Sequence, residues 1–199
     1  MRKAVLVLLI LLLPLTAFAD RKKAAEATGK AEREIQIGNI PKAEKLLREA
    51  VQQDPTYAKA NRMLGDVLSL EHKYGAASDA YSAALNNDPN GMLTDEEKRQ
   101  VRDQIGVSTA LGGNLPKAKS IFEEAIKSDP DYPLYRYNLA CTYAEMDNLD
   151  SAIEHLREAW KRRKNLAEGE RFPDPRQDSS FKRFLSDKRF QDAVRDMVF

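Results

Sequence analysis

The chain repeats one short pattern at a fixed distance. An alanine is followed by a large apolar residue four positions later and by a second alanine three positions after that. These three residues share one face of an α-helix. The period is 34 residues between the first two copies and between the last two: Ala43, Leu47 and Ala50; Ala77, Tyr81 and Ala84; Ala118, Phe122 and Ala125; Ala152, Leu156 and Ala159. Such a period predicts an array of similar helical units.

Each copy is expected to be the second helix of a helix pair. Proline ends the first three of these helices, after Asp54, Asp88 and Asp129, because the residue before proline is disfavoured in the α region. Lys164 stands at the corresponding position of the fourth. In the preceding helices a small residue follows an apolar one, which lets the two helices approach: Leu64-Gly65, Ile105-Gly106 and Leu139-Ala140. Turns are expected where residues tolerate the left-handed conformation: Gly38-Asn39, His72-Lys73, Gly112-Gly113-Asn114 and Asp147-Asn148.

This pattern resembles the tetratricopeptide-repeat (TPR) family over residues 24–166. The resemblance implies an all-α fold, a right-handed TPR solenoid of four helix hairpins with a C-terminal helical cap. The expected repeats are residues 20–57, 58–91, 92–132 and 133–166, followed by a linker and capping helices over 167–199. Lys30-Ala31 replaces leucine-glycine in the first repeat, as is common in terminal repeats, and no repeat has the early tryptophan.

The second and third copies are 41 residues apart, and the additional seven fall around residues 90–97. The sequence from Thr94 to Glu97 predicts a capping box, in which each side chain bonds the backbone amide of the other residue. We therefore expect an extended first helix in the third repeat, starting near Thr94. A longer loop is the alternative.

The C-terminal segment contains apolar residues at helical spacing after a polar, proline-containing loop over 168–180. Asp187 is expected to cap a last helix over Lys188 to Met197. A repeat array leaves its last apolar face bare, so this segment is interpreted as a cap. Trp160 is expected to pack against the phenylalanines of the cap.

Residues 1–19 have the pattern of an export signal: a basic start, an apolar run over 4–13, and Ala17-Phe18-Ala19 before Asp20. The apolar run is shorter than the roughly 20 residues that span a bilayer. The sequence therefore predicts cleavage near Ala19 and a periplasmic or secreted protein without membrane insertion after cleavage. A retained membrane anchor is the alternative.

Charge and composition argue against several functions. The formal net charge is +1 for the whole chain, which gives no general attraction to nucleic acid or anionic lipid. One cysteine and two histidines cannot form a zinc cluster, and neither histidine has a sequence-local acid or nucleophile. His155 is expected on the exposed side of its helix. We expect no enzyme activity, no cofactor and no metal.

The resemblance implies that first helices line a concave groove. The residues expected to face a protein or peptide partner there are Thr28, Glu32, Lys59, Arg62, Asp66, Asp103, Val107, Leu134, Tyr137 and Cys141. They suggest a ligand with a carboxylate near Arg62 and apolar side chains near Tyr137. Alternatively, the C-terminal segment covers Leu134 and Tyr137. Thr28 and Glu32 replace the lysine and asparagine of the family's clamp for chaperone tails, so that ligand is rejected.

Two functions follow from these expectations. The first is a non-enzymatic scaffold or adaptor in the cell envelope that binds a protein or peptide through its groove. The second is a structural subunit of an envelope assembly, which associates with itself or another subunit through its outer helix faces.

Overall fold

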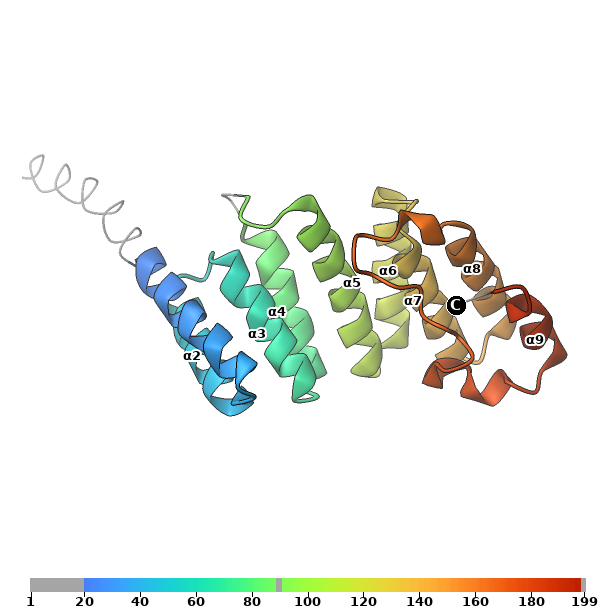
Figure 1. Cartoon of the computed structure of the whole chain (residues 1–199), viewed down its shortest axis with the longest axis horizontal. Helices are drawn as coiled ribbons and strands as arrows, with labels where there is room; N and C mark the ends of the chain where they lie inside the picture. The colour runs from blue at the N-terminus through green and yellow to red at the C-terminus, as the bar shows by residue number, and fades with distance from the viewer. Residues whose placement is uncertain (1–19, 89–90, 198–199) are drawn as a thin grey trace, which may run out of the picture. The chain divides into compact units, whose positions relative to one another are not determined.

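The computed structural model describes residues 20–88 and 91–197. The expected export signal, residues 1–19, lies outside the described residues. The chain divides into two compact units, Met1–Val101 and Arg102–Phe199, called unit 1 and unit 2 below. The described residues form helices and no strands, which confirms the all-α prediction (Figure 1).

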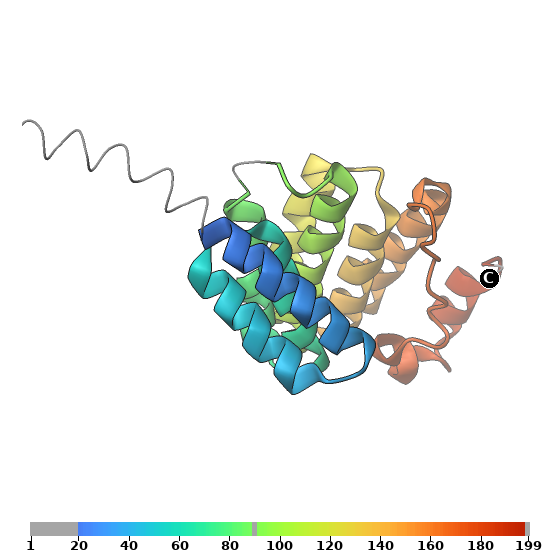
Figure 2. The ribbon, with the colours of Figure 1, turned by 60° about the vertical axis from the view of Figure 1, so that its left-hand side comes forward.

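Unit 1 consists of antiparallel helix pairs. Its helices are a helix over residues 20–36, α2 (Ile40–Gln53), α3 (Ala58–Leu70), α4 (Tyr74–Asn86) and the beginning of α5 (Asp95–Leu111). Figure 2 shows the first helix and α2 side by side with opposite directions, and α3 and α4 pack together in the same way. Alanine makes this close packing feasible: Ala43, Ala50 and Ala77 are fully buried.

Unit 2 continues the hairpins and ends in the cap. It contains the remainder of α5, α6 (Leu115–Ser128), α7 (Pro133–Glu145), α8 (Leu149–Lys161), the 3₁₀-helices η1 (Arg163–Asn165) and η2 (Ser179–Phe184), and α9 (Lys188–Val194). As predicted, α2 and α6 end directly before Asp54 and Asp129. The last helix ends at Val194, three residues earlier than expected, and Arg195 to Met197 form a turn and irregular structure.

The turns inside the hairpins adopt the conformation that the sequence predicts. One residue in each has a positive φ: 76° at Gly38, 58° at His72, 86° at Gly113 and 60° at Asp147. Two turns therefore place an L-amino acid in the left-handed region that glycine adopts more readily.

Glycines inside two first helices allow an aromatic ring to lie against the backbone. A Cβ added at Gly65 would lie 2.6 Å from the ring of Tyr81, and one at Gly106 would be still closer to the ring of Phe122. Both distances are shorter than carbon atoms tolerate. The prediction that these positions remove bulk where paired helices meet is confirmed.

The predicted capping box is present at the start of α5. The backbone amide of Glu97 donates to Thr94 Oγ1 at 3.1 Å, and the backbone amide of Thr94 donates to the Glu97 carboxylate at 2.9 Å. The helix has 17 residues, against 13 in α3 and in α7. The third repeat therefore has the extended first helix, and a longer loop alone does not account for the additional residues.

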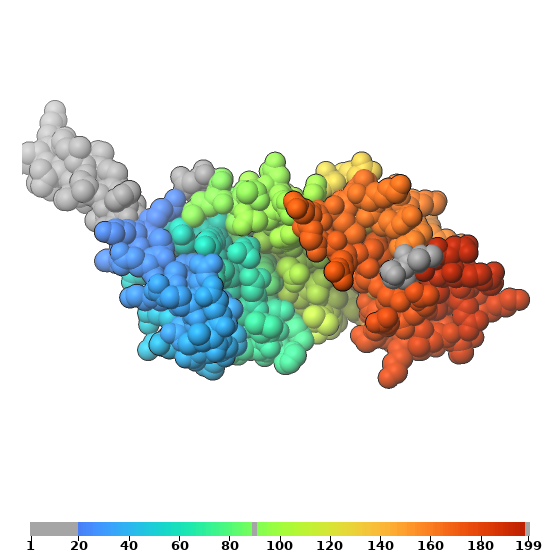
Figure 3. Space-filling view, viewed as in Figure 1, coloured from blue at the N-terminus to red at the C-terminus, as the bar shows by residue number. Residues whose placement is uncertain are grey.

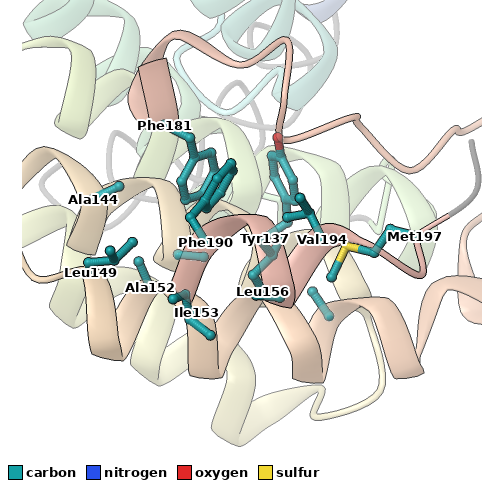
Figure 4. Packing of buried hydrophobic residues seen from close by; sticks show 13 residues of the cluster. Tyr137, Ala144, Leu149, Ala152, Ile153, Leu156, Phe181, Phe190, Val194 and Met197 are labelled. Carbon is teal, nitrogen blue, oxygen red and sulfur yellow. The ribbon is translucent and has the colours of Figure 1, made fainter. Parts of the chain in front are cut away.

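The cap covers the last hairpin with aromatic and aliphatic side chains. In Figure 4, the rings of Phe181 and Phe190 stack on each other, with centroids 5.3 Å apart, and both are buried. Val194 and Met197 join the same cluster as Leu156 of α8. Asp187 caps α9 as predicted, because its carboxylate accepts from the amide of Arg189 at 2.8 Å.

Candidate functional site

Half of the predicted groove residues lie in unit 1, on the helix over 20–36 and on α3. Here the charged side chains pair with each other. Lys59 Nζ lies 3.5 Å from the Glu32 carboxylate, and Arg62 Nη1 lies 3.2 Å from that of Asp66. Tyr81 Oη also donates to Asp66 at 2.8 Å, while burial raises the pKa of this carboxyl group. This face presents paired charges of both signs.

Two predicted groove residues are buried and bind their own chain. Thr28 is 1 % exposed, and its hydroxyl donates to the carbonyl oxygen of Ala24 at 2.7 Å. Asp103 of α5 is 6 % exposed, and Asn138 Nδ2 of α7 donates to both of its carboxylate oxygens at 2.8 and 2.9 Å. Burial raises the pKa of Asp103 to about 7. The expectation that Thr28 and Asp103 face a ligand is therefore corrected.

The C-terminal segment packs against α7 through η2 and the residues before it, and this packing covers the next predicted residue. Tyr137 is 2 % exposed, and its hydroxyl donates to Asp178 at 2.8 Å. Its ring meets Phe172 edge-on, with centroids 5.4 Å apart, and Phe172 in turn meets Trp160 at 5.3 Å. Trp160 packs against the cluster that contains Phe181 and Phe190, as expected, while its direct ring contact is with Phe172 of the preceding loop. Figure 3 shows this segment in orange on the surface of unit 2.

The alternative that the C-terminal segment covers the groove at its last repeat thus holds for Tyr137, which corrects its placement as a ligand-facing residue. Leu134 is half-buried and packs against the cluster that contains Phe122 and Tyr135. Sequence periodicity could not reveal the cover, because residues 167–184 do not follow the repeat.

The remaining two predicted residues, Val107 and Cys141, line a cleft of about 500 Å³ in unit 2, called the unit-2 cleft. Its walls come from the end of α5, the start of α6, one face of α7 and the residues that begin η2. The lining consists of Val107, Ala110, Leu111, Gly113, Leu115, Phe122, Asn138, Cys141, Thr142, Glu145, Asp178, Ser179 and Ser180. Of this lining the sequence predicted two ligand-facing residues. Leu111 could have been found by following the exposed face of α5 to its end.

The thiol in this cleft is poorly suited to nucleophilic chemistry. Burial raises the pKa of Cys141 well above its ordinary value, and the nearby Asp178 carboxylate raises it further. Cys141 Sγ donates to Asp178 at 3.6 Å. A thiol held protonated is a weak nucleophile.

The second histidine lies in a different environment from the one expected. His155 is half-buried, and its ring stacks on Tyr143 with centroids 5.4 Å apart. Burial lowers its pKa. Its placement on the exposed side of α8 is therefore corrected: an edge of α8 packs against α7.

Within residues 20–88 and 91–197, no group of three or more histidine, cysteine, aspartate or glutamate side chains is arranged to hold a metal ion. No helix in these same ranges is both long and apolar enough to cross a bilayer.

Consecutive antiparallel hairpins, with small residues at the helix contacts and a cap at the end, define a helical repeat protein. Two family models, both described as tetratricopeptide repeat, match residues 28–91 and 112–169, together more than half of the chain. The chain belongs to the tetratricopeptide-repeat family.

Curated relatives share part of this chain. The probable UDP-N-acetylglucosamine–peptide N-acetylglucosaminyltransferase SPINDLY of Hordeum vulgare is 31% identical over 120 residues, which cover 60% of this chain and 13% of that protein. Hsp70-Hsp90 organizing protein 3 of Arabidopsis thaliana is 30% identical over 122 residues, 60% of this chain and 21% of that protein. The matched region thus spans about an eighth of the length of the first relative and about a fifth of the length of the second.

Solved structures show the same fold. A crystal structure of MamA superposes with a TM-score of 0.61 at 20% identity, over 74% of this chain and 82% of that one. A second MamA crystal structure gives a TM-score of 0.61 at 20% identity, over 78% and 81%. At this identity the likeness concerns the fold alone.

Proposed function

We propose that the protein is a non-enzymatic adaptor or scaffold that binds a segment of a partner protein in the unit-2 cleft. The observation that carries this proposal is the cleft itself, which combines apolar and polar walls from first helices and the C-terminal segment. TPR proteins generally mediate protein–protein interactions, which agrees with a surface built for a polypeptide.

The cleft has the chemistry that an interface needs at its centre. Leu111 retains 55% of its surface exposed at the end of α5, and Val107 and Leu115 continue the apolar wall beside it. Binding energy concentrates on such apolar positions when a polar rim excludes water from them. Asn138, Thr142 and Glu145 supply that polar rim.

We further propose that the protein works outside the cytoplasm, in the cell envelope or beyond it. The support is the basic, apolar and small-residue pattern of residues 1–19. A fold whose single cysteine leaves no internal disulfide to form does not depend on the redox state of that compartment.

The test is affinity capture from envelope extract with two matched variants. Leu111 is the last residue of α5 and lines the cleft, while Leu70 is the last residue of α3 and is 63% exposed in unit 1. Leu111→Asp and Leu70→Asp thus introduce the same change at equivalent repeat positions. We expect to capture a partner that binds the purified protein directly. This partner should be absent from the capture with Leu111→Asp and present in the capture with Leu70→Asp.

A partner retained by both variants would show that the cleft is not the binding surface. If a defined oligomer of the chain itself were the sole product recovered, the structural-subunit function would replace the adaptor. Circular dichroism of both variants checks that neither substitution disturbs the helices.

A further inference from the structure

We propose that the unit-2 cleft selects a lysine or arginine side chain of the partner protein; this specificity rests on the proposed function. Three independent features of the cleft lead to this occupant: the sign of its charges, the kind of hydrogen bonds that its polar groups still offer, and the apolar wall that leads to them.

The charges around the cleft are predominantly negative. Glu145 and Asp178 contribute two carboxylates to its lining, and among the described residues this lining includes no lysine, arginine or histidine. One guanidinium lies nearby: Arg183 Nη2 is 3.4 Å from Glu145, and Arg183 Nη1 is 3.8 Å from Asp147. The two carboxylates of the lining against this one guanidinium leave an excess of negative charge, which favours a cationic ligand.

Three side-chain hydrogen-bond donors of the cleft are committed to the chain itself. Asn138 Nδ2 donates to Asp103, Thr142 Oγ1 donates to the carbonyl oxygen of Asn138, and Cys141 Sγ donates to Asp178. The side-chain oxygens of Asn138 and Thr142 and the carboxylate of Glu145 remain as acceptors for a ligand. An ammonium group has three donors and a guanidinium has five, and neither has an acceptor. Such heads match a wall of acceptors better than a carboxylate or an amide does.

The apolar wall fits the stem of the same side chains. Val107, Ala110 and Leu111 of α5 and Leu115 at the start of α6 line the same cleft as the polar groups of α7. Lysine and arginine bury three or four methylene groups along apolar surface while the charged head reaches a polar site. A small inorganic cation would leave this wall uncovered.

The experiment measures binding of small probes by amide chemical shifts of protein obtained by expressing all 199 residues. The probes are n-butylammonium, 1-butanol and butyrate, which share the stem and differ in the charge of the head. We expect saturable shifts at Val107, Thr142 and Ser179 with n-butylammonium, weakened by added salt. Butanol is expected to bind at least about threefold more weakly, and butyrate more weakly still. Equal binding of butanol and n-butylammonium would overturn the proposal.

Variants of the carboxylates test whether the negative charge of the cleft causes it to bind n-butylammonium. Glu145→Gln is expected to weaken n-butylammonium about threefold, and Glu145→Lys more than about tenfold. Lysine at this position is compatible with the fold, because positive charge is favourable at the C-terminal end of α7. The matched control is Asp147→Asn, which removes a carboxylate that faces the same Arg183 but lies outside the lining. Unchanged binding is expected for this control, and equal losses at both sites would contradict the proposal.

The source of the cation is tested by a second pair of probes. N-acetyl-lysine methylamide carries the side chain on a backbone, whereas spermidine places further charges where the wall is apolar. We expect the lysine derivative to bind at least as tightly as spermidine, and tighter binding of spermidine would overturn a protein partner as the source. An oligomer of the chain that dissociates on Glu145→Gln would equally overturn it, in favour of a second copy.

The partner-capture test distinguishes binding in the unit-2 cleft from the preference of that cleft for a cation. Loss of the partner with both Leu111→Asp and Glu145→Lys supports both proposals. If Leu111→Asp loses the partner while Glu145→Lys retains it, the cleft is the binding surface and its preference for a cation is wrong. If neither variant loses the partner, the proposed function fails first.

Discussion

Four pairs of residues, each separated by sixteen positions, set how closely the helices of a hairpin approach. Glycine faces a ring in two repeats, as Gly65 with Tyr81 and Gly106 with Phe122. In the outer two repeats the equivalent pairs are Ala31 with Leu47 and Ala140 with Leu156, all of them fully buried. The smaller residue on the first helix therefore faces the larger side chain on the second helix, because close packing keeps the volume at the contact nearly constant.

The Gly106 pair gives a direct test of this volume rule. Gly106→Ala places a methyl group against the ring of Phe122 and is expected to destabilise unit 2 by about 1–3 kcal/mol. Phe122→Leu alone leaves space and is expected to cost about 1 kcal/mol. Together they reproduce the alanine–leucine pair of the last repeat, so the double variant should be more stable than Gly106→Ala. The free energy of unfolding is measured by urea titration of the fluorescence of Trp160, the chain's single tryptophan. If the loss of stability in the double variant equalled the sum of the two single losses, the volume rule would be contradicted.

The buried carboxyl group of Asp103 makes the stability of unit 2 depend on pH. Burial raises its pKa to about 7, the charge of Glu170 adds to the rise, and the hydrogen bond from Asn138 opposes it. An unfolded aspartate has a pKa of about 3.9. Between these values the folded protein holds a proton that the unfolded chain has lost. Stability is therefore expected to fall as pH rises from about 4 to about 7.

Asp103→Asn removes this titration while keeping the shape of the side chain. The variant is expected to show a smaller decrease in the urea midpoint between pH 5 and pH 8, and to exceed the parent protein in stability at pH 8 by up to about 4 kcal/mol. Glu124→Gln, a neutralisation on the exposed face of α6, is the control for the loss of one charge. A parent protein whose stability rises over this range would contradict the assignment.

At the scale of elements, the C-terminal segment determines which part of α7 a partner can reach. Its Asp178 accepts from Tyr137 at 2.8 Å, and Glu170 accepts from Tyr132 at 2.7 Å. Phe172 and Phe181 contribute rings that pack on Tyr137. The segment thus fills the face of α7 near Tyr137 and also supplies one wall of the unit-2 cleft.

Phe181 is expected to be the residue through which the cap stabilises the last hairpin. It is fully buried between Tyr137 and Phe190, so Phe181→Ala should lower the stability of unit 2 by about 3–5 kcal/mol. Leu185→Ala, four residues later and 41% exposed, should cost less than about 1 kcal/mol. Hydrogen exchange at α7 and α8 locates the effect. Equal losses of stability at the two positions would show that Phe181 is not the residue through which the cap stabilises the hairpin.

The helices and part of the cleft could be predicted from sequence because they obey the period of the repeat. Position within the period placed Val107 and Cys141 on the inner side of their helices, and both line the cleft. Asp178 to Ser180 could not be predicted, since they lie in a segment without periodicity whose path depends on tertiary contacts. The burial of Asp103 was missed because its partner, Asn138, lies 35 residues away on another helix.

At the scale of the whole molecule, stability rests on packing rather than on covalent links. The single cysteine, Cys141, is free and committed to a hydrogen bond with Asp178. Every repeat buries alanine and one large apolar residue at its helix contacts, which supplies a core without a disulfide. Such a fold suits an oxidising compartment and a reducing one equally.

The proposed export of the chain can be tested through its processing. Signal peptidases require small residues at the positions just before the cleaved bond, which Ala17 and Ala19 provide. In a bacterial host that expresses all 199 residues, we expect a periplasmic protein whose first residue is Asp20, as determined by mass spectrometry.

Ala19→Arg should retain the longer precursor in the membrane fraction, because a large charged side chain does not fit the peptidase site. Asp20→Asn, on the other side of the bond, should be processed normally. A full-length product for the parent chain would instead favour the retained anchor, and the adaptor would then work while tethered to the membrane.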